Sequence, residues 1–172
     1  MNLVVADASP IHYLVLINAA HVLPKLFTKV MIPEHIVAHE LQSPMTPPLV
    51  RSWAVNLPPW VETRNPANPE RLGLDIGEEH AIALAVELSA PLLLDEKEGR
   101  KVAKEKDLIV IGTVGIIERA ADLNLLDIRL AFEALRRTNA WISESLIDEA
   151  IQRHARRVSD RSAGRTPPLP EK

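Results

Sequence analysis

The sequence contains no cysteine, so it can form neither a disulfide framework nor a thiolate metal site. No apolar run approaches the roughly 20 residues needed to span a bilayer. The first residues also lack the basic and then apolar pattern of a signal peptide. These absences exclude a disulfide-rich secreted domain, and we expect a cytoplasmic protein that has no contact with membranes.

Aromatic side chains are scarce, and basic side chains are not in excess. Aromatic residues make up 3% of the chain, which argues against a stacking platform for single-stranded bases. The formal net charge is −3 and the pI is about 6.1, so no overall basic surface is expected. Any binding of nucleic acid must therefore depend on a local basic patch or on phosphates bridged by a metal ion.

The 172 residues that are present suffice for one domain with its own core. Short apolar runs alternate with helical segments, which predicts an α/β fold with a mainly parallel sheet of four to five strands. We expect a single domain at 1–157, which includes a Pro-rich insertion or lid at 43–72 and C-terminal helices at 125–157, followed by a disordered tail at 158–172.

The expected strands are apolar throughout, as in a parallel sheet that is covered on both faces. They lie at residues 3–6, 30–32, 92–94 and 108–111, with an edge strand near Val61. Helices are expected at residues 9–18, 22–27, 33–42, 50–55, 78–88, 97–106, 113–122, 125–137 and 143–157.

Asp7 stands at the tip of the first expected strand. An Asp before a helix is commonly its N-cap, but Ser9 can cap this helix and Pro10 suits its first position. Ligands of parallel sheets bind beyond the carboxyl ends of the strands, so we favour a functional role for Asp7.

Glu40 shares a predicted helix face with Ile36 and Val37. A carboxylate on this apolar face is costly unless it is paired or binds a metal ion, whereas at a frayed helix end it would turn to solvent. His35 and His39 have i, i+4 spacing without a zincin motif, and we interpret them as solvated surface residues.

Two pairs of neighbouring acids follow. Glu78 and Glu79 open a helix, where the helix dipole explains one of them and periodicity does not choose between the two. Asp95 and Glu96 end the third buried strand, unless they are merely solvated acids of a turn. Acids on separate elements that converge on one sheet edge suit Mg²⁺ or Mn²⁺ and predict phosphodiester hydrolysis.

Five segments in order resemble the PIN domain, and most closely the PIN-like relatives of VapC toxins that occur beside antitoxin genes. They are DASP at 7–10, HELQ at 39–42, GEEHAIALA at 77–85, LLLDEKEGR at 92–100 and IGTVGII at 111–117. The resemblance runs from Leu3 to Asn124 and implies a three-layer α/β/α fold. It also implies a metal-dependent, single-strand-selective endoribonuclease that leaves a 5′-phosphate.

The resemblance implies one set of acids for both catalysis and metal binding, with one or two Mg²⁺ or Mn²⁺ ions. The set is Asp7, Glu40, Glu78 and Asp95, with Glu79 and Glu96 as alternates. We assign substrate binding to Thr113, which matches a hydroxyl residue near the metal-bound water or phosphate, to Arg100 on the basic side of its helix, and to Ser9.

The sequence departs from the family pattern at His80, where similar sequences repeat an acid, and at Lys97 and Glu98, where VapC toxins carry a further Asp. The metal site can therefore be weakened. The resemblance implies an RNA substrate, a cognate antitoxin in a type II toxin–antitoxin module, and a homodimer. The alternative is a catalytically weak PIN-fold protein that binds RNA or a partner. A receiver-like phosphoacceptor fits less well, because Asp7 has no second acid beside it.

Overall fold

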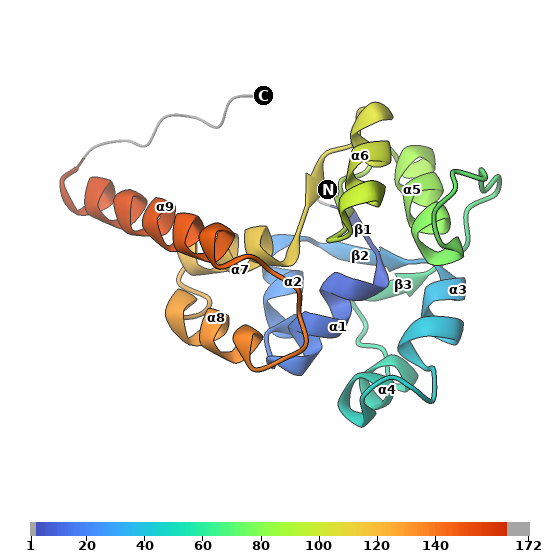
Figure 1. Ribbon diagram of the computed structural model, residues 1–172, viewed down its shortest axis with the longest axis horizontal. Coiled ribbons are helices and arrows are strands. Elements are labelled where there is room, and N and C mark those ends of the chain that lie inside the picture. Colours follow the sequence, from blue (N-terminus) through green and yellow to red (C-terminus); the bar gives the residue numbers. More distant parts are fainter. Residues whose placement is uncertain (1–2, 165–172) are drawn as a thin grey trace. The chain divides into compact units, whose positions relative to one another are not determined.

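The computed structural model describes residues 3–164 (Figure 1). The chain forms two compact units, one that ends at Thr113 and one that begins at Val114. Within residues 3–164, no helix is both long and apolar enough to cross a membrane.

The first unit is built on a parallel sheet whose strand order is β3-β2-β1-β4-β5. The fold is therefore of the predicted α/β class, and the strand near Val61 does lie at an edge. The strands within the described residues are β1 (Leu3–Ala6), β2 (Lys29–Ile32), β3 (Val61–Thr63), β4 (Leu92–Leu93) and β5 (Val110–Ile111).

Helical segments connect these strands. The segments before β3 are α1 (Ala8–Leu16), the 3₁₀ turn η1 (Ala20–Val22), α2 (Leu23–Leu26), α3 (Glu34–Ile36), the π-helical turn η2 (Val37–Leu41) and α4 (Pro48–Val55). The later ones are α5 (Ile76–Leu88) and α6 (Lys97–Glu105). The expected insertion at 43–72 thus contributes both a helix and the edge strand to the fold.

The strand order reverses at β1, where Val5 pairs with Met31 of β2 on one side and with Leu92 of β4 on the other. Right-handed crossovers then place the helices before and after β3 on opposite faces. Figure 1 shows α1 and α4 on one side of the sheet and α5 and α6 on the other, as expected of a three-layer fold. The gap beyond the carboxyl ends of β1 and β4 is the topological switch point, where parallel sheets bind ligands.

Helix α5 and strand β4, whose sequences are almost wholly apolar, are buried as this composition predicts. Ile82 and Leu84 of α5 and Leu92 and Leu93 of β4 are fully inaccessible to solvent. The helix ends at Ser89, whose φ of 49° is left-handed and stops the helical hydrogen-bond pattern. Burial on both faces explains why β4 shows no polar alternation.

Two predicted helices that carry candidate site residues differ from expectation. The prediction of Ser9 as an N-cap is wrong: α1 begins at Ala8, and Asp7 is the extended cap residue, with φ −76° and ψ 168°. Both residue types cap helices well, and the backbone conformation decided between them. The helix expected at 33–42 divides into α3 and the π-helical turn η2, which contains Glu40.

The second unit contains the later helices, which are α7 (Thr113–Asp122, entered from the first unit), α8 (Ile128–Arg136) and α9 (Glu144–Ser162). Asp127 caps α8 by accepting hydrogen bonds from two backbone N–H groups, and Ser143 caps α9. Ile147 and Ala150 are buried on α9, whereas Leu146 is exposed.

The α9 helix continues past the expected domain end at residue 157. Residues 158–162 are helical, so the predicted disordered tail cannot begin at 158. Arg161, which was expected in the tail, instead belongs to this helix. Its guanidinium donates a hydrogen bond to the backbone carbonyl oxygen of Asp122. The remaining prediction for 165–172 lies outside the described residues. The assignment of 1–157 to one domain stays a prediction.

Candidate active site

Asp7 occupies the switch point directly after β1 and is 4% exposed. Its backbone N–H donates a 3.0 Å hydrogen bond to the carbonyl of Leu93 in β4. Its carboxylate Oδ2 accepts a long bond of 3.4 Å from the N–H of Ser9. Burial raises the pKa of Asp7 to about 7, and the negative charge of Glu40 adds to the shift. Asp7 therefore both caps α1 and faces another acid.

Glu40 reaches this region from the π-helical turn η2, a backbone form that is frequent at functional sites. Its carboxylate packs against the start of α5: a Cβ at Gly77 would lie 1.8 Å from Oε1 of Glu40 and 3.2 Å from a side-chain carbon of Ile36. The absence of a side chain at Gly77 therefore leaves the space that the Glu40 carboxylate occupies. Burial raises the pKa of Glu40 to about 7, with contributions from the charges of Asp75 and Glu78.

Glu78 lies in the first turn of α5 and is 6% exposed. A Cβ at Gly99 of α6 would come within 2.6 Å of its Oε1. This oxygen is buried and has no hydrogen-bond partner among the described residues. Burial raises the pKa of Glu78 to about 7, helped by the charges of Asp75 and Asp7. A buried carboxylate oxygen without a donor is costly, so the site favours a cation there.

Glu79, the alternate to Glu78, has different surroundings although it is only 3% exposed. Its Oε1 accepts hydrogen bonds from the backbone N–H groups of Leu72, at 2.8 Å, and Gly73, at 3.1 Å. The guanidinium of Arg71 lies 3.7 Å from its Oε2. Glu79 therefore fixes the segment that leads into α5, which leaves Glu78 as the better metal-ligand candidate.

Asp95 follows β4 on the other side of the switch point. Thr113 donates to both of its oxygens, from N to Oδ1 at 2.7 Å and from Oγ1 to Oδ2 at 2.6 Å. Burial raises the pKa of Asp95, while the Thr113 hydrogen bonds and the charge of Arg100 oppose the shift. Glu96 is exposed and makes no side-chain cap contact, so Asp95 is the better candidate of this pair.

The predicted substrate residues are placed differently from one another. The Thr113 hydroxyl is fully buried and engaged with Asp95, so it positions that carboxylate. Arg100 donates from Nη1 to the carbonyl oxygen of Leu94 at 2.8 Å and is held beside the strand end. Ser9 is half-buried in the first turn of α1, and its role in substrate binding stays a prediction.

Sequence reasoning missed Asp75. It caps α5 by accepting a 2.9 Å hydrogen bond from the N–H of Glu78, and its charge raises the pKa values of Asp7, Glu40 and Glu78. An Asp placed three residues before a Glu at a helix start is a capping signal that could have identified it.

The structure thus couples Asp7, Glu40 and Glu78 through their charges, and places Asp95 on the neighbouring strand. In the described part of the chain, no three His, Cys, Asp or Glu side chains are arranged so that they could hold a metal ion. The donor chemistry nevertheless fits a hard cation, because the carboxylates repel one another and an oxygen of Glu78 is buried without a partner.

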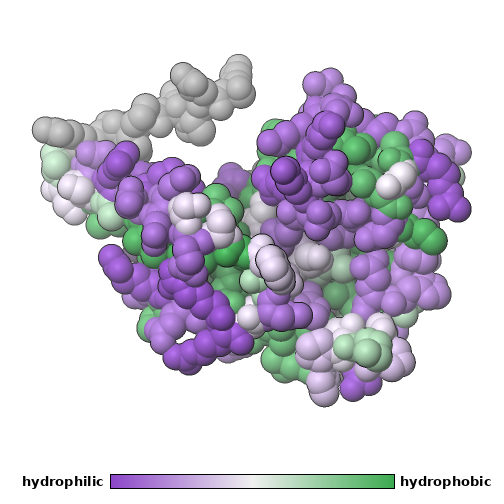
Figure 2. Space-filling model, in the orientation of Figure 1, coloured by the Kyte–Doolittle hydropathy of each residue, from purple (hydrophilic) through white to green (hydrophobic). Residues whose placement is uncertain are grey.

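A basic cavity of about 690 Å³ adjoins Asp95. Its lining comes from the side of α6 on which the sequence predicts a basic patch, and Figure 2 shows a hydrophilic surface over this helix. The lining residues are Asp95, Lys97, Arg100, Lys101, Lys104 and Glu105. Positive charge beside the half-buried Asp95 is an arrangement suited to a phosphate backbone.

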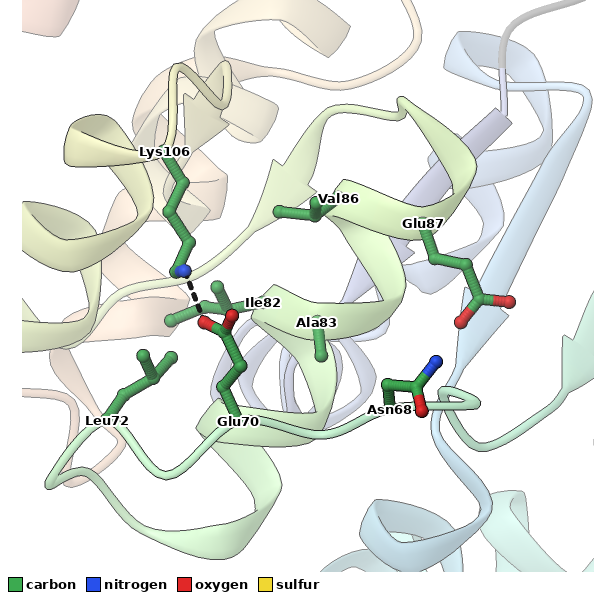
Figure 3. A pocket seen from close by; sticks show the side chains of 8 residues that line it. All are labelled: Asn68, Glu70, Leu72, Ile82, Ala83, Val86, Glu87 and Lys106. Atoms are coloured by element: carbon green, nitrogen blue, oxygen red, sulfur yellow. Dashed lines mark hydrogen bonds and ion pairs between the residues drawn. The ribbon is translucent and has the colours of Figure 1, made fainter.

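A second, smaller cavity of about 190 Å³ lies on α5 (Figure 3). Ile82, Ala83 and Val86 form its apolar floor, and an ion pair between Glu70 and Lys106 borders it. None of the candidate acids lines this cavity. It is therefore separate from the candidate active site.

Fold and site together define a parallel α/β protein with clustered carboxylates at its topological switch point. Residues 3–156 match a protein family described as the PIN domain, and the chain belongs to this family. This match confirms the resemblance seen in the sequence, while the relation to VapC toxins stays a prediction. Membership indicates a nuclease-type activity, and PIN domains typically use divalent metal ions and act on RNA. No curated protein and no solved structure matches the chain.

Proposed function

We propose that the protein is a metal-dependent, single-strand-selective endoribonuclease whose site holds Mg²⁺ or Mn²⁺ through Asp7, Glu40, Glu78 and Asp95. The observation that carries this proposal is that burial, together with the charge of Asp75 and the repulsion among the three acids, raises the pKa values of Asp7, Glu40 and Glu78 to about 7. Such a cluster destabilises the fold unless a compensating group is present.

A divalent cation is the group that compensates this repulsion best. Carboxylate oxygens are its preferred ligands, and the unpartnered Oε1 of Glu78 offers one. The cluster binds a cation only after it loses its protons, so occupancy is linked to pH. When bound, the ion polarises the scissile phosphate and lowers the pKa of a bound water.

The remaining residues position these groups. Thr113 fixes both oxygens of Asp95, and Glu79 fixes the segment before α5. The ammonium groups of Lys101 and Lys104 in the basic cavity bind RNA phosphates and bring a strand past Asp95. Selectivity for single strands rests on the family resemblance.

The biological role in this proposal is that of a toxin in a type II toxin–antitoxin module. A cognate antitoxin protein would cover the acidic cleft, and the active form would be a cytoplasmic homodimer. These statements rest on the resemblance to VapC-associated proteins. Light scattering of the purified protein at several concentrations tests the dimer, and a concentration-independent monomer mass rejects it.

The second candidate function is a catalytically weak PIN protein that binds RNA or a partner. It is favoured by the lack, within residues 3–164, of three side chains arranged around a metal position. The departures from the family pattern at His80 and Lys97 point the same way.

Cleavage of labelled single-stranded RNA in Mn²⁺, Mg²⁺ or EDTA decides between the two. We expect metal-dependent cleavage that disappears in Asp7→Asn and Asp95→Asn and persists in Asp107→Asn. Asp107 is an exposed acid with a left-handed φ of 58°, which Asn tolerates, so it provides a matched control. A contaminating nuclease would survive in all variants. Absence of cleavage on several RNAs, together with no Mn²⁺ binding in calorimetry at pH 8, would establish the weak-binding alternative.

A further inference from the structure

Three imidazole rings, from α3, η2 and α5, lie together in the first unit. The ring centroid of His35 is 4.5 Å from that of His39 and 5.2 Å from that of His80, with interplanar angles of 36° and 55°. His35 is the central ring, since it contacts both of the others. His39 is exposed, and the other two are half-buried. The interpretation of these two residues as solvated surface histidines agrees with the exposure of His39, whereas His35 is half-buried between the other two rings.

This histidine cluster adjoins the candidate active site. His39 directly precedes Glu40, and His80 follows Glu78 by two residues on α5. The charge of Asp75, which acts on the acids, also acts on His35. The cluster therefore lies on the same segments of the chain that carry Glu40 and Glu78.

Packing rather than a hydrogen bond holds the rings. Within the described part of the chain, Nδ1 of His80 is buried and has no hydrogen-bond partner. Burial lowers the pKa of His35, and the neighbouring His39 and His80 lower it further, while the charge of Asp75 opposes the shift. Flat rings that lie against one another, with one exposed member, provide a surface on which another flat ring can stack.

We propose that the cluster of His35, His39 and His80 is a base-stacking subsite, in which an unpaired nucleobase of the RNA substrate packs on the exposed ring of His39. This inference rests on the proposed ribonuclease function and adds to it a contact that selects unpaired bases. The scarcity of Phe, Trp and Tyr does not exclude it, because histidine rings stack with bases as well.

Stacking is measured with an octamer RNA that contains 2-aminopurine, in EDTA so that cleavage does not interfere. Fluorescence quenching reports stacking, and anisotropy of an end-labelled copy reports affinity. We expect His39→Ala to lose the quenching and to weaken binding about tenfold. We expect His39→Phe to retain both, since it keeps a flat ring. His21→Ala is the matched control, because His21 is exposed on the 3₁₀ turn η1, outside the cluster.

Each outcome separates the subsite from the nuclease proposal. The subsite is rejected if wild type binds no octamer, if His39→Ala behaves as wild type, or if His39→Phe loses as much as His39→Ala. The subsite is supported if quenching requires the aromatic ring at position 39. If this holds while wild type cleaves no RNA, only the catalytic proposal fails. Conversely, metal-dependent cleavage with no ring-dependent quenching retains the nuclease and overturns the subsite.

Discussion

Thr113 holds both oxygens of Asp95, with a 2.6 Å hydrogen bond from its hydroxyl to Oδ2 and a 2.7 Å hydrogen bond from its backbone N–H to Oδ1. Two bonds from one residue fix the plane of a carboxylate. Asp95 is thereby held at the carboxyl end of β4, next to the strand that ends at Asp7. Thr113 is accordingly a positioning residue in the proposed site.

Replacement of Thr113 by Val tests this role, because Val has the same shape without the hydroxyl. We expect kcat/KM for RNA cleavage to fall about tenfold, as for other residues that orient metal ligands. The free energy of unfolding is expected to fall by about 1–2 kcal/mol, since a buried hydrogen bond to a carboxylate is lost. Thr113→Ser keeps the hydroxyl and should retain most activity. Equal cleavage by the Val variant and wild type would exclude the positioning role.

The sequence predicts the fold well because its local signals are strong. Leu92, Leu93 and Leu94 lack polar alternation, which in this chain results from burial on both faces. The bounds of α7 agree with the expected helix at 113–122. Two local features could not be predicted in this way: Asp7 rather than Ser9 is the N-cap of α1, and Glu40 lies in the π-helical turn η2. Both depend on backbone dihedrals and hydrogen bonds that composition does not encode.

The candidate site is less predictable, because it depends on contacts between distant segments. Glu78 and Glu79 are both buried on the same helix, so periodicity cannot separate them. The difference arises from the backbone of Leu72 and Gly73, which binds Glu79 alone. Likewise, nothing local reveals that His80 meets His35 across two elements.

The pair Glu78→Gln and Glu79→Gln separates the roles of these neighbours. Glu78→Gln removes a charge from the acid cluster, so Mn²⁺ affinity and cleavage should fall at least about tenfold. Its metal-free form should be more stable at pH 8, since repulsion is relieved. Glu79→Gln retains an amide oxygen that accepts both backbone N–H groups, and should cleave like wild type. Calorimetry with Mn²⁺ and the cleavage assay measure the contrast, and the opposite pattern would make Glu79 the ligand.

The stability of the metal-free protein should decrease as pH rises. The carboxyls of Asp7, Glu40 and Glu78 have pKa values of about 7 in the fold, against 3.8 or 4.5 in their ordinary state. The folded state therefore binds more protons than the unfolded state between these values. Stability conferred by the protonated forms is present at low pH and is lost as pH rises through 7.

Thermal unfolding between pH 5.5 and 8 measures this effect. We expect Tm without metal to fall over this range, and Mn²⁺ to raise Tm more at pH 8 than at pH 6, since the ion binds deprotonated carboxylates. Glu78→Gln removes one of the three acids, so it serves as the control and should show a shallower decrease. A metal-free Tm that rises with pH, or that does not respond to this substitution, contradicts the acid cluster.

The second unit contains its own charge cluster, centred on Glu118 of α7. Arg153 of α9 donates to both of its carboxylate oxygens, at 3.0 and 2.8 Å, and Arg157 donates to Oε1. Burial alone would raise the pKa of Glu118, but the hydrogen bonds and charges of the two arginines outweigh it and hold the pKa below 4.5. Glu118 is thus a stabilising ion-pair partner whose contribution requires its charge.

Glu118→Gln should reduce the free energy of unfolding by about 1–2 kcal/mol at pH 7, because it removes the charge from hydrogen bonds that are partly shielded from water. The lowered pKa means that the stabilisation is present above pH 4.5 and is lost as pH falls through the folded pKa. The difference from wild type should therefore vanish in acid. Urea titrations at pH 7 and below pH 4 measure it. Glu149→Gln is the control, since its exposed contact with Arg153 is 3.6 Å long.

Gly77 provides a test of Glu40 that does not touch a carboxylate. Ala at this position would place Cβ 1.8 Å from Oε1 of Glu40, so the end of that side chain must move. Ala also favours helix over Gly by up to about 1 kcal/mol. The 3.2 Å approach of its Cβ to the buried Ile36 opposes this gain, so we expect little net change in the free energy of unfolding. Cleavage and Mn²⁺ affinity should nevertheless fall to the level of Glu40→Ala.

A double-mutant cycle establishes whether the effect passes through Glu40. In the Glu40→Ala background the obstructing carboxylate is absent, so Gly77→Ala should cause no further loss of Mn²⁺ affinity or cleavage. This non-additivity is expected because the two residues are in contact and act on one ligand position. Independent, additive losses would instead show that Gly77 supports the site through the backbone of α5 and not through Glu40.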